Sequence, residues 1–134
     1  MERKEPYATK KEFNKLVVRF HDIPPVEMLP GVHAKIVTTE KVSIETYTFA
    51  PNSRYPTHHH ESEQIMIFME GAGDELVDGK LYPVKGGDII IIPSNVEHGL
   101  YTSDRGCYAI TISAPPRYDL VAKIKALKDE AGLK

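Results

Sequence analysis

Short apolar or alternating runs, broken about every 8–12 residues by Gly, Pro or Asn, make up most of this chain. This length and spacing are typical of β-strands in a sandwich or barrel, and they do not fit alternating strands and helices. Asp78 and Gly79 lie between two such runs and predict a two-residue hairpin, because both turn positions need positive φ. The expected strands are 16–20, 34–38, 42–50, 55–60, 64–70, 74–77, 80–84, 88–92, 99–101 and 107–113.

The two ends of the chain have a different pattern. Residues 1–15 are polar and rich in Lys and Glu, and we expect a short helix or a loose arm there. Beyond residue 115, apolar residues recur at helical spacing with lysines on the other face. The expected organisation is an N-terminal arm over 1–15, an antiparallel all-β barrel over 16–114, and a C-terminal segment over 115–134. The helix of that segment, expected over 118–130, packs on the barrel.

Composition and charge argue against several classes of function. The chain has 17 basic and 19 acidic residues among its 134, so there is no electrostatic reason to bind nucleic acid. Cys107 is the only cysteine, which excludes an intrachain disulfide, and its apolar run places it in the core. The apolar runs 65–69 and 89–92 are too short to span a bilayer, and no signal-peptide pattern is present. We expect a cytoplasmic protein that does not bind membranes.

Four polar side chains carry the clearest chemistry. His58 and His60 are two apart on an expected strand, so their side chains leave one face while His59 points away. Gln64 opens the next strand, which can return its amide oxygen to that face. His98 follows a later apolar strand and supplies a third imidazole. Three imidazoles and one oxygen suit one divalent ion per chain, whether Zn, Ni, Fe, Co, Cu or Mn.

At these residues the sequence resembles the cupin superfamily. Its first motif usually reads Gly, five residues, His-x-His, three or four residues, Glu, six residues, Gly. Here the same spacing runs from Asn52 through His58, His60 and Gln64 to Gly71. Asn52 is a mild change, because Asn tolerates the left-handed region better than most residues. Gln64 stands where the family usually has a Glu ligand, and it resembles a branch of small cupins that use a Gln oxygen.

The second cupin motif usually reads Gly, five residues, Pro-x-Gly, two residues, His, three residues, Asn. Here it runs from Gly87 through Pro93, Asn95 and His98 to Thr102. The resemblance covers residues 30–115. It implies a jelly-roll barrel, the antiparallel double-stranded β-helix, with the three histidines and the Gln as metal ligands. It also implies a homodimer, the habit of the family.

The resemblance suggests a metal-dependent enzyme that acts on a small oxygen-rich molecule, such as a sugar, uronate or keto acid, by lyase or isomerase chemistry. The neutral Gln leaves the ion's charge uncompensated, which favours an anionic substrate. Two alternatives stay open: an Fe(II)-dependent dioxygenase, and a non-catalytic cupin that binds or senses a small ligand. Fold alone does not separate the three.

Several further residues are candidates for the site. A branch that opens unsaturated uronates has an Asp, a Phe and an Arg near the end of its barrel. Thr111, Ser113 and Arg117 stand at those positions here, so only the Arg survives. Met66 and Phe68 share the face of Gln64, so they either line the cavity beyond the metal or belong to the core. The candidates for moving a proton are Tyr47, Tyr55, Tyr101, Tyr108 and Arg117, and the weaker candidates for a ligand or base are Glu61 and Glu63.

Overall fold

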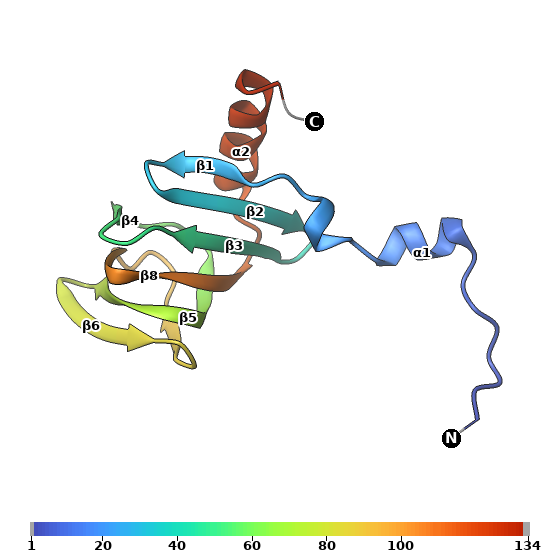
Figure 1. The fold of residues 1–134 in the computed structure, drawn as a ribbon, viewed down its shortest axis with the longest axis horizontal. Helices are drawn as coiled ribbons and strands as arrows, with labels where there is room; N and C mark the ends of the chain where they lie inside the picture. Colours follow the sequence, from blue (N-terminus) through green and yellow to red (C-terminus); the bar gives the residue numbers. More distant parts are fainter. Residues whose placement is uncertain (1, 133–134) are drawn as a thin grey trace.

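The computed structural model describes residues 2–132 and shows a body of antiparallel strands, a C-terminal helix and an extended N-terminal arm (Figure 1). This confirms the antiparallel β class and the short C-terminal helix. The strands are β1 (Val26–Leu29), β2 (Val32–Thr38), β3 (Ser43–Phe49), β4 (Arg54–His58), β5 (Glu63–Val77), β6 (Lys80–Lys85), β7 (Ile89–Ile92) and β8 (His98–Ala114). The helices are α1 (Lys10–Leu16), the 3-10 helix η1 (Phe20–Asp22) and α2 (Tyr118–Glu130).

The long strands β5 and β8 pair with each other along almost their whole length and hold the barrel together. The first half of β5 pairs with β7, and its second half pairs with β6. The first half of β8 pairs with β4, and its second half pairs with β3. Through these pairings the two long strands join all eight strands into one sheet.

Both long strands bend at glycines. Gly71 and Gly106 have φ values of 84° and 64°, which favour glycine. A Cβ on Gly71 would lie 2.1 Å from the Gly106 carbonyl oxygen, so a side chain there would clash with the backbone of β8. From the sequence, these glycines mark breaks between strands. We therefore expected two strands in place of β5, over 64–70 and 74–77, and two in place of β8, over 99–101 and 107–113. That division was wrong, because the β5–β8 pairing continues through the bend, with bulges.

The turns follow the sequence expectations more closely. Asp78 and Gly79 both have positive φ, as a two-residue hairpin between β5 and β6 requires. Asn52 and Asn95, which stand where the motifs usually have glycine, have φ values of 56° and 63°. The two substitutions thus keep the left-handed turn conformation.

The segment before the barrel differs from its expected structure. Residues 16–20 do not form a strand: Leu16 ends α1, and Phe20 begins η1. A capping box starts α1, because the Thr9 side chain accepts from the Glu12 N–H while Glu12 accepts from the Thr9 N–H. The arm leaves the body, so residue 16 has no sheet partner, and Leu16 is exposed (Figure 1). The barrel begins later, at β1, a strand that the sequence did not reveal.

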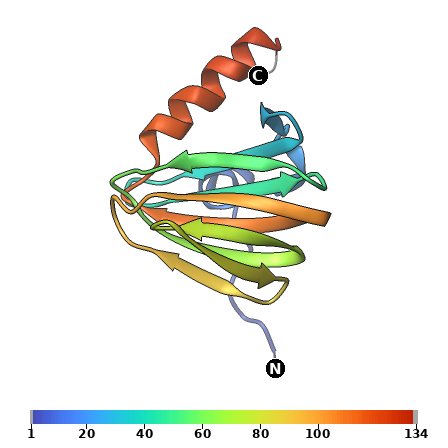
Figure 2. The same ribbon diagram turned by 90° about the vertical axis from the view of Figure 1, so that its left-hand side faces the viewer.

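The C-terminal helix covers one end of the barrel. α2 contacts β1 and β2, and it stands beyond the stacked strands in Figure 2. Leu120 and Ile124 are buried in the main core, in line with the helical spacing of the sequence. Within residues 2–132 no helix has the length and apolar content needed to cross a membrane.

Candidate metal centre

Three histidines converge at one end of the barrel. His58 ends β4 and His98 begins β8, and the two are paired across these strands. Their ring centroids lie 4.2 Å apart, and the His60 centroid is 4.8 Å from that of His98. One nitrogen from each ring lies within 4.8 Å of the others. Among the described residues, this is the one group of His, Cys, Asp and Glu side chains that could hold a metal ion.

His60 joins the two other histidines from outside a strand, whereas strand alternation predicted that it would lie on the same strand as His58. β4 was expected to continue to residue 60, but it ends at His58, so His60 leaves from the connector. Hydrogen bonds hold that connector in place. The Asn95 N–H donates to the His60 carbonyl at 2.8 Å, and the Ser62 hydroxyl donates to the Pro115 carbonyl at 2.6 Å. The connector is therefore fixed to the turn of the second motif and to the residue that follows β8.

Each histidine presents the same nitrogen to the centre. Nδ1 of His58, His60 and His98 lies 2.9 Å from the carbonyl oxygen of Pro56, Ser62 and Val96, respectively. A carbonyl only accepts, so each Nδ1 carries the proton and donates. Each Nε2 then has a free lone pair. Backbone carbonyls that fix the ring and its tautomer in this way are typical of histidines that ligate metals.

Gln64 contributes an oxygen beside His60. Its Oε1 lies 3.1 Å from Nε2 of His60. With Nδ1 of His60 donating to Ser62, Nε2 is an acceptor, so two acceptors face each other. A cation between them resolves the conflict, and ligand bonds of about 2.0–2.2 Å place neighbouring ligand atoms about 3 Å apart. The residues present therefore fit a divalent metal ion.

Burial keeps the imidazoles neutral. Desolvation lowers the pKa of His98 to about 4, and it also lowers the pKa of His58 and of His60. Nε2 of His98 is fully buried and has no hydrogen-bond partner among the described residues. A buried polar atom without a partner is costly, and a bound ion would satisfy it.

The cluster adjoins a narrow cavity inside the barrel, of about 30 Å³. Tyr47, Tyr55, Met66 and Arg117 line it together with Gln64, as the sequence hypothesis for these residues requires. Other expected residues lie elsewhere. Phe68 is fully buried in the core, Tyr101 stacks with Arg54 on the outside, Tyr108 lines a different hollow beside Arg105, and Glu61 and Glu63 are exposed.

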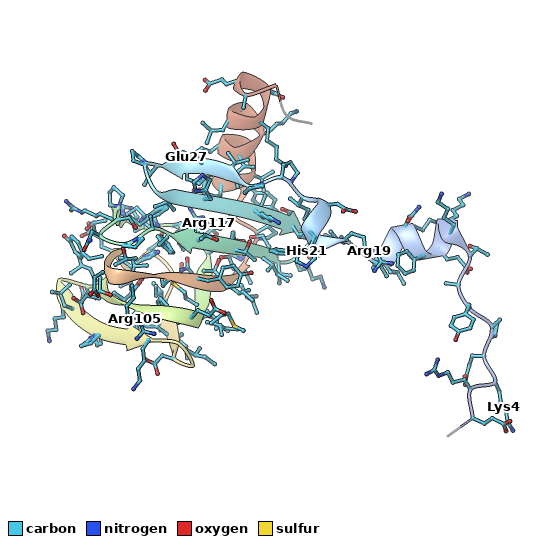
Figure 3. All side chains as sticks on the ribbon, in the orientation of Figure 1. Lys4, Arg19, His21, Glu27, Arg105 and Arg117 are labelled. Carbon is cyan, nitrogen blue, oxygen red and sulfur yellow. The ribbon has the colours of Figure 1, made fainter. Side chains whose placement is uncertain are left out.

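Arg117 brings a positive charge to the cavity from the link between β8 and α2 (Figure 3). Its Nε and Nη2 donate to the two carboxylate oxygens of Asp119, each at 3.0 Å. Burial alone would lower the pKa of Arg117, but the hydrogen bond and charge of Asp119 outweigh it, and the pKa is raised. Burial also raises the pKa of Tyr47 and of Tyr55, so both hydroxyls keep their protons.

Sequence reasoning missed two buried carboxyl groups in the barrel. Oε1 of Glu45 accepts from the hydroxyls of Thr111 and Ser113, at 2.9 and 2.7 Å. A carboxylate thus stands on β3 next to Thr111, the position where the uronate branch has its Asp. Glu75 on β5 lines the cavity itself. The available signal was strand parity, which turns Glu45 toward the same face as Tyr47, and Glu75 toward the face opposite its exposed neighbour Asp74.

The remaining histidines lie outside the cluster. His21 and His59 are exposed, and Nε2 of His33 lies 3.5 Å from a Glu27 oxygen. His21 is on the side of the arm, away from Arg117 (Figure 3).

Solved structures share this architecture. The structure of KdgF from Halomonas sp. superposes with a TM-score of 0.71 and 23% identity, covering 76% of this chain and 94% of that one. An RmlC-like cupin from Shewanella frigidimarina gives a TM-score of 0.73 and 20% identity, covering 78% and 95%. At such identities the likeness shows the fold alone.

A curated relative is longer. The HTH-type transcriptional activator RhaS of Klebsiella pneumoniae is 28% identical over 78 residues, which are 58% of this chain. The chain spans 28% of the length of that relative.

The family model of the cupin domain matches residues 45–112, which contain all four candidate ligands. With that match, the jelly-roll topology and the three-histidine cluster beside the barrel cavity, this chain belongs to the cupin family.

Proposed function

We propose that the protein is a metal-dependent cupin that binds a small anionic, oxygen-rich molecule, such as a keto acid, uronate or related carboxylate, and catalyses lyase or isomerase chemistry on it. The observation that carries the proposal is the set of neutral donors, Nε2 of His58, His60 and His98 with Oε1 of Gln64. Three of the four residues, His58, Gln64 and His98, line the barrel cavity.

A divalent ion held by these four residues would polarise a bound carbonyl or carboxylate oxygen and stabilise negative charge on it. The residues around it supply the rest of the site. Arg117 offers a second positive group to an anionic ligand, and Asp119 holds its guanidinium. The protonated hydroxyls of Tyr47 and Tyr55 can donate hydrogen bonds to a ligand oxygen, or pass a proton to the carbon beside it.

A second candidate function is ligand sensing without turnover. The observation that favours it is the match to HTH-type transcriptional activators, of whose length this chain spans about a third. In such a protein the same four ligands and the same cavity would hold the small molecule, and no proton would move.

We also propose that the protein forms a homodimer through the outer face of β3, β8, β5 and β7. Isoleucines stand next to each other across four paired strands, and several are exposed. They form two rows: Ile44, Ile112, Ile65 and Ile91 in one, and Ile110, Ile67 and Ile89 in the other. Monomers rarely expose an apolar face of this extent, and a second copy can cover it across a two-fold axis, where each patch meets itself.

Replacing His60 with Ala should lower metal affinity at least about 100-fold, because it removes one ligand and leaves Gln64 without its neighbour. Metal content after dialysis, measured by mass spectrometry, checks this. His59→Ala is the matched control, since His59 is exposed and outside the cluster. One ion per chain in His60→Ala would contradict the ligand assignment.

Metal-loaded protein in D₂O should exchange the methyl protons of pyruvate for deuterium. Solvent takes up a methyl proton as the stabilised enolate forms, and an exchanged hydroxyl of Tyr47 or Tyr55 returns a deuteron to the carbon and is reloaded from solvent. Proton NMR follows the exchange, and His60→Ala gives the background rate. Binding of pyruvate with no exchange above that rate would favour the sensing function over the enzyme.

Gln64→Glu should hold metal at least as tightly and bind malonate more weakly. A carboxylate cuts the net charge of the site from +2 to +1, and one unit charge about 4 Å away changes an interaction by about 4 kcal/mol before solvent reduces it. Calorimetric titration with metal and then malonate measures both effects. Glu63→Gln, an exposed neighbour, should bind malonate like the wild type. Equal or tighter malonate binding by Gln64→Glu would show that Gln64 does not set the charge of the site.

Ile91→Lys should convert the dimer to a monomer, because it places a charge in the isoleucine rows. Sedimentation velocity measures the mass. Tyr118→Lys is the control, since Tyr118 on α2 is 62% exposed and Ile91 63%, and it should leave the dimer intact. A wild-type monomer, or a dimeric Ile91→Lys, would rule out this interface.

A further inference from the structure

Glu75 occupies an unusual place for a carboxyl group. It lies on β5 opposite Leu100 of β8, and Leu100 in turn is opposite Tyr55 of β4. His98 stands two residues before Leu100 on β8 and faces His58. The row that holds Glu75 is therefore the row next to the histidines, about 7 Å along the strands. Glu75 is 2% exposed and lines the same cavity.

The carboxyl group has no partner in the protein that would account for its position. Its Oε2 is fully buried and unpaired among the described residues. It does not belong to the group of potential metal ligands, which contains only the three histidines. Much of the surrounding wall is apolar, from Phe49, Met66 and Leu100. Glu45 differs, because two hydroxyls satisfy one of its oxygens. A ligand bound in the cavity could form the hydrogen bond that this buried carboxyl group lacks within the protein.

We propose that Glu75 is a ligand-binding residue of this cavity: its protonated carboxyl group donates a hydrogen bond to an oxygen of the small molecule, at the end away from the histidines. The inference rests on the proposed function and specifies the class of ligand more narrowly. That ligand carries one anionic oxygen group at the histidine cluster and a second hydrogen-bond acceptor, a carboxylate or carbonyl, about one strand row away.

Electrostatics support the neutral form of Glu75. Burial raises its pKa to about 8, so the isolated group already holds its proton at neutral pH. An ionised Glu75 would repel a ligand carboxylate, whereas the O–H donates to it. The anionic ligand in turn offsets the positive charge of a metal ion held by the histidines, which would otherwise favour ionisation of Glu75. The short dicarboxylate malonate has both features and is the natural probe.

The test is calorimetric titration of malonate into Zn-loaded protein. Glu75→Met removes the hydrogen bond and fills the space, so malonate affinity should fall at least about tenfold. Glu75→Gln keeps an N–H donor, so its affinity should stay within about threefold of the wild type. Asp74→Asn, an exposed acid next to Glu75 on β5, should have no effect. All variants should keep one Zn per chain, and Glu75→Met should melt no lower than the wild type, because it removes an unpaired buried polar group.

The outcomes separate this inference from the proposed function. Wild-type malonate affinity in Glu75→Met would overturn the role of Glu75 and leave the metal site and its anionic ligand standing. Loss of Zn in Glu75→Met would also overturn it, because the residue would then serve the metal. A wild type that holds Zn but does not bind malonate would overturn both proposals together.

Discussion

The pairing of β5 with β8 is the constraint on which the rest of the structure depends. Gln64 lies near the start of β5, and Val77, the partner of His98, lies at its end. In a straight strand those positions would be about 40 Å apart. Because both strands bend where Gly71 meets Gly106, the barrel closes and the two ends of β5 face one cluster. The ligand group exists only in the closed fold, so whatever holds the bend also holds the site.

Within that frame, short backbone contacts set the chemistry of the cluster. The carbonyl that orients each histidine belongs to a residue two positions away in the chain: Pro56 lies within β4, and Ser62 and Val96 lie in connectors. The orientation of each histidine ring therefore depends on contacts within its own segment, whereas the meeting of the three rings depends on strand pairing between distant segments. Local contacts determine which ring nitrogen is unprotonated, and the β4–β8 and β5–β8 pairings bring these nitrogens together. This division explains how a short motif can be recognised in a sequence whose relatives are only about a quarter identical.

Sequence reasoning succeeded for the features that depend on period and spacing. Alternation located the central strands, helical spacing located α2, and the spacing of the motifs selected the four residues of the cluster. It failed where the outcome depends on tertiary contacts. Glycines at 71 and 106 looked like strand ends, because only the partner strand shows that they are bends. Residues 16–20 are apolar enough for a strand, yet the capping box at Thr9 and the lack of a neighbouring strand leave them in the arm. Tyr108 was a candidate by residue type, and its strand turns it outward.

Buried side-chain atoms without a hydrogen-bond partner mark the positions where the fold is less stable than it could be. Among the described residues three such atoms lack partners: Oε2 of Glu45, Oε2 of Glu75 and Nε2 of His98. His98 and Glu75 line the cavity, and Glu45 stands behind Thr111, which lines it. An apolar residue at each position would pack the barrel at lower cost, since each unpaired atom costs about 1–3 kcal/mol. Unpaired atoms scattered through the core would signal poor packing, whereas their gathering at one cavity signals a surface prepared for a ligand. The position of these three atoms therefore supports the proposal that the cavity receives a ligand.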